Sequence, residues 1–448
     1  MTALALAAAT LLGRLLPIGV AYQAKLLCSS VFVAGREPAD VLATDLDPAS
    51  LHPLLNLIRT DVDPEARRVR ASFLGLVERQ AVFRPGQGSV VAIGGPPVDL
   101  GAPPHAPQAG PAAADAPWPA GERVGPLDAG GALAAAVAGA LAEPDPARLR
   151  RTRAVVVVHR GRIVAEGYAP GFAPDTPLLG WSVTKTVTAA LVGVLVGEGR
   201  WALDQPVPVP EWADDDPRAA ITLEQLLQMR SGLEFREEYG DPLADVTTML
   251  FASRDAGGFA AAKPLVADPG ARWSYASGTT NLLCRAMAAA LGPRYASFPR
   301  RALFDPLGMR SAVLEADAGG HFVGSSFGWA TARDWARLGL LWLQDGVWEG
   351  RRLLPAGWVA FCTREAPGSA GHYGGHLWLK IPAGYRAQGP APTLPADAFH
   401  AVGHEGQFVS VVPSRQVVVV RLGLTRGRHV WDHAGFLQGV LAALPVDE

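Results

Sequence analysis

A serine and a lysine three residues apart are the strongest chemical feature of the sequence. Ser182 and Lys185 open an apolar stretch that runs to Val196 and ends at Gly197. Three residues advance a helix by nearly one turn, so the hydroxyl and the amine share one face. At a helix N-terminus the serine meets unpaired N–H groups and the positive end of the dipole. A lysine in apolar surroundings loses hydration of its charged form and can act as a base. The pair therefore predicts a nucleophilic serine; the alternative is a capping serine beside a lysine that reaches solvent.

Two later clusters could complete such a site. Tyr275 and Ser277 lie between a Pro-Gly turn and a helix that begins near Thr279. Further on, residues 404–406 (His-Glu-Gly) immediately precede a strand over residues 408–412. Taken singly, a tyrosine in a Gly/Ser loop is ordinary packing and a histidine in a glycine turn is weak evidence. Their order after the Ser-x-x-Lys helix is what carries information.

Together the three elements resemble the serine β-lactamase/penicillin-binding-protein superfamily, whose nucleophile motif is Ser-x-x-Lys. The flanks agree, because residues 226–233 and 304–309 resemble two conserved turns of that superfamily. The similarity covers roughly residues 128–448. It is strongest to the branch that contains class C β-lactamases, family VIII-type esterases and 6-aminohexanoate-dimer hydrolases.

The resemblance implies a role for each cluster. The Tyr275 hydroxyl would relay the proton between the nucleophile and the leaving group. The backbone N–H groups of Ser182 and Gln407 would form the oxyanion hole. The remaining residues that would line the substrate groove are His404, Gly406 and Ser277.

Two departures from the family pattern bear on the substrate. His404 stands where β-lactamases have a lysine whose charge holds a carboxylate, with Glu405 beside it, and Ser277 stands where class C enzymes have an asparagine. We therefore expect a serine hydrolase that cleaves an ester or a simple amide through a covalent acyl-enzyme. The alternatives are a penicillin-binding or DD-peptidase-like protein, and an acylatable sensor with little turnover. No metal or organic cofactor is implied, because no His, Cys or Asp cluster has ligand spacing.

A second serine motif competes with Ser182. Residues 324–328 read Gly-Ser-Ser-Phe-Gly and fit the G-x-S-x-G nucleophile elbow, with Ser326 as the nucleophile. That motif requires a preceding core strand and surrounding βα units, and neither is predicted here. We expect this turn to border the groove or to connect two helices.

The elements that position these residues suggest an α/β sandwich. Strands are predicted over 154–159, 162–167, 408–412 and 417–422, and their near-continuous Val runs indicate a sheet covered on both faces. Helices are predicted at both ends of this region, over 132–141 and 433–444. We thus expect one antiparallel sheet built from both ends of the catalytic region, flanked by helices and interrupted by a large helical insertion.

The composition supports a globular chain of 448 residues with a small N-terminal extension. Forty basic and 42 acidic residues leave a net charge of −2, so no field favours nucleic acid. Only four lysines occur, which makes a lysine in a chemically suggestive place more informative. Three widely spaced cysteines predict buried free thiols. The predicted parts are a signal peptide or membrane anchor (1–24), an N-terminal extension (25–97), a Pro/Ala/Gly-rich linker (98–127) and a β-lactamase-like hydrolase domain (128–448).

The first residues decide the expected location. Apolar runs over 3–12 and 15–21 are interrupted by Arg14, and residues 19–21 form an acceptable cleavage site. We expect export to the periplasm or attachment to a membrane through this segment. A cytosolic amphipathic N-terminus is the alternative. Small-molecule esters or amides are the expected partners, and the oligomeric state stays open.

Overall fold

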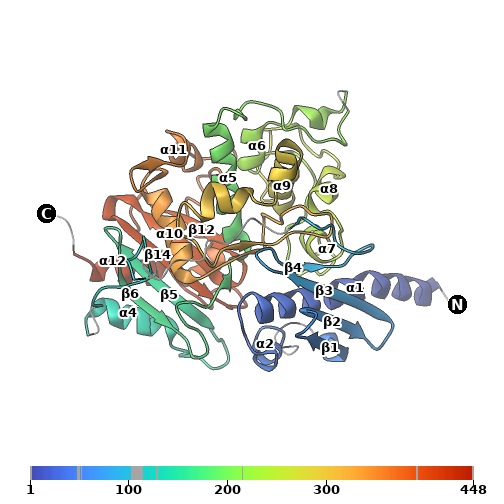
Figure 1. Ribbon diagram of the computed structural model, residues 1–448, viewed down its shortest axis with the longest axis horizontal. Coiled ribbons are helices and arrows are strands. Elements are labelled where there is room, and N and C mark those ends of the chain that lie inside the picture. The colour runs from blue at the N-terminus through green and yellow to red at the C-terminus, as the bar shows by residue number, and fades with distance from the viewer. Residues whose placement is uncertain are drawn as a thin grey trace.

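A five-stranded antiparallel sheet organises the computed structural model, which describes residues 3–47, 51, 53–101, 115–127, 130–213, 215–389 and 392–445. The strand order is β12-β13-β14-β5-β6 (Figure 1). The strands are β5 (Thr152–His159), β6 (Arg162–Tyr168), β12 (Phe399–Gly403), β13 (Gln407–Val412) and β14 (Val417–Gly423). Since β14 pairs with β5, the sheet is built from both ends of the catalytic region, as predicted. Strand β12 was not anticipated.

Both faces of this sheet are covered. Val155 and Val157 of β5 pack in one core with helices α4 (Ala132–Leu141) and α12 (His433–Ala443). Val156 and Val158 face the opposite core, which contains α5 (Thr184–Gly197) and α10 (Ala332–Leu343). Alternate side chains of a strand point to opposite faces, so a continuous Val run suits a sheet with helices on either side. The α/β sandwich is therefore confirmed.

The chain between β6 and β12 is mostly helix and loop. Its other α-helices are α6 (Leu223–Leu227), α7 (Asp245–Phe251), α8 (Ala256–Ala261), α9 (Ser277–Leu291) and α11 (Trp358–Cys362). Its short strands are β7 (Leu178–Leu179), β8 (Val313–Leu314), β9 (Gly328–Ala330), β10 (Val347–Trp348) and β11 (Arg351–Arg352). Strands β7, β9 and β8 form one small sheet in that order, and β10 pairs with β11.

Short helical turns complete the catalytic region. The 3-10 turns are η2 (Trp181–Val183), η3 (Pro217–Ala220), η4 (Gly292–Arg294), η6 (Ala383–Tyr385), η7 (His404–Gly406) and η8 (Pro413–Arg415), and η5 (Arg300–Phe304) is a π-helical turn. Local sequence signals set several helix starts. Thr222 and Gln225 form a capping box at the start of α6, and the Thr331 side chain caps α10.

The described residues between 3 and 101 form a second unit, which we call the N-terminal module. Helix α1 (Ala3–Phe32) runs past residue 24 without a break and lies against an antiparallel sheet in the order β1-β2-β3-β4 (Figure 1). The other elements are α2 (Pro38–Thr44), the 3-10 turn η1 (Pro53–Leu57), β1 (Ile58–Asp63), β2 (Arg68–Phe73), β3 (Val77–Arg84) and β4 (Gly88–Val91). The leucine-rich sequence of residues 51–58 predicts a helix, but this segment forms only the turn η1. Over residues 58–61 the side chains alternate between half-buried and exposed, and the segment pairs with β2.

A buried ion pair ties the N-terminal module to the catalytic region. The Lys25 amine lies 2.5 Å from Glu315 Oε2, and both side chains are almost fully enclosed. The hydroxyl of Ser29, the backbone N–H of Ser89 and the indole N–H of Trp329 also donate to the Glu315 carboxylate, at 2.6 to 2.9 Å. A buried charge is tolerated only when it is paired and hydrogen-bonded, so this network holds the module at one place.

The predicted linker over 98–127 is described only at its two ends, because residues 102–114 lie outside the described part. Its second end packs on α10. Trp118 is buried in the main core, and Arg337 of α10 donates to the carbonyl oxygens of Pro119 and Gly121 at 2.9 and 2.6 Å. This end is therefore bound to the catalytic region.

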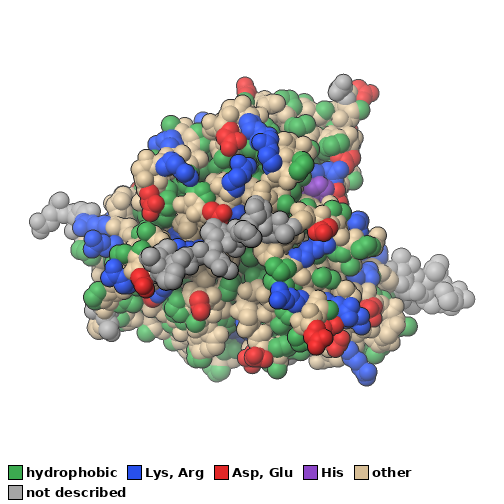
Figure 2. Space-filling model, viewed as in Figure 1, with side chains coloured by type: hydrophobic (Ala, Val, Ile, Leu, Met, Phe, Trp, Pro, Cys, Tyr) green, Lys and Arg blue, Asp and Glu red, His purple; other side chains and the backbone are tan. Residues whose placement is uncertain are grey.

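The cysteines and the surface charges are arranged as the composition predicts. Cys28, Cys284 and Cys362 are buried and free, as predicted. Figure 2 shows Lys and Arg side chains interspersed with Asp and Glu across the visible face. By length and composition alone, the part of α1 over 11–32 could cross a membrane, although most of that window is buried inside the protein.

Candidate active site

Ser182 lies in the turn η2, directly before α5. The preceding residue, Trp181, has a φ of 47°, in the left-handed region that non-glycine residues rarely adopt. Such a conformation costs on the order of 1–3 kcal/mol and persists only where the surroundings enforce it. Here the Trp181 indole N–H donates to Glu405 at 3.2 Å, and its ring lies edge-on to His404. The strained turn therefore holds the Ser182 hydroxyl at one position beside η7.

Lys185 lies one turn further along and reaches back to the serine. Its amine donates to Ser182 Oγ at 2.9 Å, to Ser277 Oγ at 2.9 Å and to the Ser325 carbonyl oxygen at 3.0 Å. These partners are all neutral. Burial lowers the Lys185 pKa to about 8, and the carboxylate of Glu237 opposes this shift. A neutral amine is thus accessible near physiological pH, which is what a base for Ser182 requires.

Tyr275 contacts both members of this pair. Lys185 Nζ lies 4.9 Å from the centre of its ring, and its hydroxyl hydrogen-bonds the Ser182 side chain. Burial raises the pKa of Tyr275 well above its ordinary value, and the charge of Glu237 adds to this effect. The hydroxyl therefore stays protonated and can give or pass on a proton. Tyr373 and Trp378 pack around the ring and fix its position.

Glu237 is a site residue that the sequence did not reveal. Its carboxylate accepts hydrogen bonds from the Ser277 hydroxyl at 2.6 Å and from the Ser277 N–H at 2.7 Å. Burial raises the Glu237 pKa, which the positive charge of Lys185 and the bonds from Ser277 oppose. Ser277, predicted to contact substrate, is thus placed between the lysine and this carboxylate. Glu237 belongs to a run of charged residues, and no local pattern distinguishes it from Glu238 beside it.

The third predicted element meets the nucleophile turn from the other side. The His404 ring stacks on Tyr239 with centroids 4.2 Å apart. Burial lowers the pKa of His404, so the imidazole is neutral at neutral pH. The Glu405 carboxylate accepts from Arg426 at 3.0 Å in addition to Trp181. Its negative charge, noted beside His404 in the sequence, is therefore paired with Arg426.

Gly406 and Gln407 complete this element. Gly406 has a φ of 83°, and a Cβ there would collide with the guanidinium of Arg421. A Cβ on Gly403, which pairs with Gln407, would collide with the carbonyl oxygen of Gly180. The end of β12 and the start of β13 therefore lie directly against the turn that carries Ser182. The Gln407 side chain donates to the carbonyl oxygens of Gly423 and His404 and accepts from the Gly423 N–H, so its amide is fully engaged within this element.

Residues 324–328 border the same site without forming a nucleophile elbow. Ser326 is fully buried, and its hydroxyl pairs with that of Ser325 at 2.9 Å. The segment leads into strand β9 and not into a helix, as a nucleophile elbow would. The N–H of Gly328 donates to Thr184 Oγ1 of α5 at 2.9 Å. Together with the bond from Lys185 to the Ser325 carbonyl oxygen, this places the turn directly against the start of α5.

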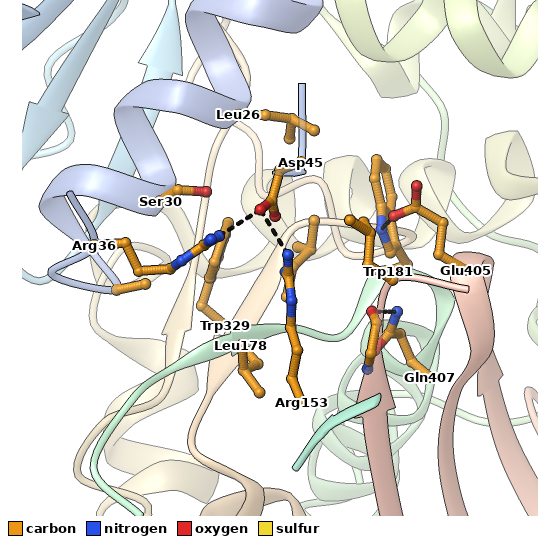
Figure 3. Close-up of a pocket in the computed structure, with 14 residues that line it drawn as sticks. Leu26, Ser30, Arg36, Asp45, Arg153, Leu178, Trp181, Trp329, Glu405 and Gln407 are labelled. Atoms are coloured by element: carbon orange, nitrogen blue, oxygen red, sulfur yellow. Dashed lines mark hydrogen bonds and ion pairs between the residues drawn. The ribbon is translucent and has the colours of Figure 1, made fainter. Parts of the chain in front are cut away.

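A small cavity separates the back of the site from the N-terminal module. Its volume is about 30 Å³, and Trp181, Glu405 and Gln407 form one wall. Figure 3 shows Arg36 and Arg153 converging on Asp45 at the opposite wall, each at 2.6 Å. Arg426, which pairs with Glu405, also donates to the Asp45 carbonyl oxygen. The module thus supports the residues behind the nucleophile.

The fold agrees with the comparisons with known proteins. The model of the beta-lactamase family matches residues 133–432, and the chain belongs to this family. Over 220 residues it is 33% identical to the 6-aminohexanoate-dimer hydrolase of Paenarthrobacter ureafaciens, covering 46% of this chain and 56% of that protein. The chain therefore spans about half the length of this curated relative.

Solved structures support the fold alone. The penicillin binding protein from Bacillus halodurans matches 70% of this chain and 100% of its own, with a TM-score of 0.53 and 16% identity. EstCE1, a hydrolase with promiscuous acyltransferase activity, matches 70% of this chain and 98% of its own, with a TM-score of 0.53 and 15% identity. The chain is thus a hydrolase-family protein with the β-lactamase/penicillin-binding-protein fold.

Proposed function

We propose that this protein is a serine hydrolase that cleaves an ester or a simple amide through a covalent acyl-enzyme on Ser182. The observation that carries the proposal is the contact of 2.9 Å between Lys185 Nζ and Ser182 Oγ, made by a buried lysine whose pKa is lowered to about 8. A lysine of this kind can take the serine proton without a histidine.

The proposed reaction begins when neutral Lys185 accepts the Ser182 proton and Ser182 Oγ bonds to the substrate carbonyl carbon. The backbone N–H groups of Ser182 and Gln407 stabilise the negative oxygen of the tetrahedral intermediate. The Tyr275 hydroxyl passes a proton to the leaving alcohol or amine as its bond to carbon breaks. Water then attacks the acyl-enzyme by the reverse proton route, which releases the acid and restores Ser182.

The charge state of the site supports an uncharged substrate around the scissile bond. His404 is held neutral by burial, and the Glu405 charge is balanced by Arg426. Aromatic rings of Tyr239, Tyr275 and Trp378 surround the reacting groups. An aromatic, neutral wall suits esters and amides with apolar acyl groups better than a β-lactam with its carboxylate. The relative named for hydrolysis of a 6-aminohexanoate dimer supports including amides.

The test is intact mass after reaction with a fluorophosphonate, for the wild type and for Ser182→Ala. A single adduct on the wild type that is absent from the variant supports the proposal. Equal labelling of both proteins would move the nucleophile elsewhere, with Ser326→Ala as the next variant. The lifetime of the acyl-enzyme from a p-nitrophenyl ester then separates an enzyme from an acylatable sensor. Hydrolysis of a β-lactam as fast as of the ester would contradict the substrate assignment.

We further propose that the chain is exported or membrane-attached through its apolar N-terminal helix. This rests on the length and composition of α1. Fractionation of cells tests it, because recovery of the full-length protein only in the cytosolic fraction would contradict it.

A further inference from the structure

Exposed apolar side chains gather in the N-terminal module. In the described part of the chain eight large apolar side chains are exposed, and only Val98 and Val266 lie outside the group considered next. The other six are Leu11, Leu12, Leu54, Leu57, Leu74 and Leu76. Scattered exposed leucines need no explanation, but six in one module of a larger protein do.

These leucines converge on one end of the module. Ile58, which follows Leu57, pairs with Phe73, which precedes Leu74. The same end lies against α1 near Gly19, where a Cβ would contact Leu55 and Ile58 at 3.4 and 3.9 Å. Leu11 and Leu12 lie about two helical turns before Gly19, on the part of α1 that leads to the free end in Figure 1. The exposed leucines thus surround the point where α1 leaves the body, and we call them the leucine tip.

The two leucines of the β2–β3 turn bury little of their surface within the protein. Leu74 has a φ of 49°, where glycine or asparagine is usual, and it is 61% exposed. Leu76 is 78% exposed. A strained turn that presents two apolar side chains to the outside is suited to insertion into an apolar phase.

The burial pattern of helix α1 indicates that this apolar phase is one leaflet of a lipid bilayer. From Ile18 to Ser30 its residues are largely buried against the module, and Lys25 is committed to Glu315. Residues 11–14 of α1 are exposed, and Leu16 packs at the edge of the module's core. A spanning helix needs about 20 residues free of the protein, and the part from Ile18 to Ser30 is occupied by the module, so the exposed apolar part of α1 is suited to lie in one leaflet. Its single charge, Arg14, is exposed and can reach the headgroups.

We infer that the leucine tip, which includes Leu11 and Leu12 of α1, forms a monotopic membrane-docking surface, and that α1 is retained in the functional protein. Removal of α1 at the apolar segment before Tyr22 would delete Ile18, Val20 and Ala21 from the core of the module. The partner is the surface of a phospholipid bilayer. The inference rests on the membrane attachment proposed above and is independent of the chemistry at Ser182.

The experiment is co-sedimentation of the full chain with vesicles of phosphatidylcholine and phosphatidylglycerol. Two double variants alter the tip, Leu74→Glu with Leu76→Glu, and Leu11→Glu with Leu12→Glu. Each should lower the fraction bound roughly tenfold or more, because two leucines lose their apolar burial. The control is Val266→Glu, an equally exposed apolar side chain in the catalytic region, which should bind as the wild type does.

Fluorophosphonate labelling of every sample shows that the variants remain folded and separates this inference from the proposed catalysis. Wild-type protein that labels normally but stays in the supernatant would overturn the docking surface and leave the hydrolase intact. Tip variants that bind as well as the wild type would overturn it too. So would a dimer, seen without vesicles and lost in the tip variants, or a protein recovered from cells without α1.

Discussion

Lys25 and Lys185 are buried to the same degree, with 2% and 1% of their surface exposed, yet they have opposite surroundings. The Lys25 amine touches the carboxylate of Glu315 directly. The Lys185 amine touches two hydroxyls and a carbonyl oxygen, and its carboxylate, Glu237, is one hydrogen bond further away behind Ser277. Direct contact with Glu315 makes Lys25 a structural link between two parts of the chain. Burial without a carboxylate in direct contact lowers the pKa of Lys185 to about 8, which suits this lysine to act as a base.

The largest effect should come from removing the base. We expect Lys185→Met to lower the rate of Ser182 acylation by about 10³-fold or more, since general-base catalysis of this kind contributes up to about 10⁴-fold. Stopped-flow acylation by a p-nitrophenyl ester measures it. In steady-state release of p-nitrophenol, adding Ser182→Ala to this variant should lower the remaining rate little further, because the two residues act as a unit. A variant within tenfold of the wild type would mean that Lys185 is not the base.

Lys25→Met should affect stability instead. It leaves the Glu315 carboxylate buried without its cation, a loss of about 3–5 kcal/mol in the free energy of unfolding. Denaturant unfolding measures this, and labelling per folded molecule should stay near that of the wild type. Lys263→Met is the control, because its pair with Asp245 is partly exposed and should contribute about 1 kcal/mol or less. An equal loss of unfolding free energy in Lys25→Met and Lys263→Met would mean that the buried pair with Glu315 is no more important to stability than a partly exposed pair.

The pH dependence of the acylation rate should report the pKa of Lys185 and the effect of Glu237 on it. Since the neutral amine is the base, the acylation rate should rise with pH and level off above a pKa of about 8. Glu237 raises the Lys185 pKa, so Glu237→Gln should move this limb to lower pH. The neighbouring Glu238 side chain is 69% exposed, and Glu238→Gln should leave the limb in place. A limb that moves to higher pH in Glu237→Gln would refute this arrangement.

The smallest effect is expected at Glu405, whose charge is paired like that of Glu315 but which touches the nucleophile turn. Glu405→Gln retains an acceptor for the Trp181 indole and weakens the pair with Arg426. A hydrogen bond to a charged group contributes about 1.5–3 kcal/mol to stability. Only the bond between Glu405 and Trp181 affects the position of Ser182, so only that part should change kcat. We expect kcat to fall by roughly tenfold with KM unchanged. A change confined to KM would indicate that Glu405 acts on the substrate and not on the turn.

Local patterns anticipated much of the architecture. The Val runs predicted strands β5, β13 and β14, and the apolar stretch after Ser182 predicted α5, because periodicity and burial are written into neighbouring residues. Strand β12 escaped notice since Phe399–Gly403 is short and carries a histidine. Segment 51–58 was assigned to a helix because its leucines fit either period, and only pairing with β2 decides for a strand after Ile58.

The sequence by itself determined that Ser182 and Lys185 share a helix face, since three residues of helix suffice for that. It also determined the order of the three elements that place the chain among the β-lactamase-like hydrolases. Only the tertiary structure decided which lysine is suited to act as a base, because Glu315 lies 290 residues from Lys25 while Ser277 lies 92 residues from Lys185. It likewise decided that Glu237 serves the site and that Glu405 is paired behind it. The protonation state of a buried group depends on charges within a few ångströms, and those neighbours are brought together by folding and not by proximity along the chain.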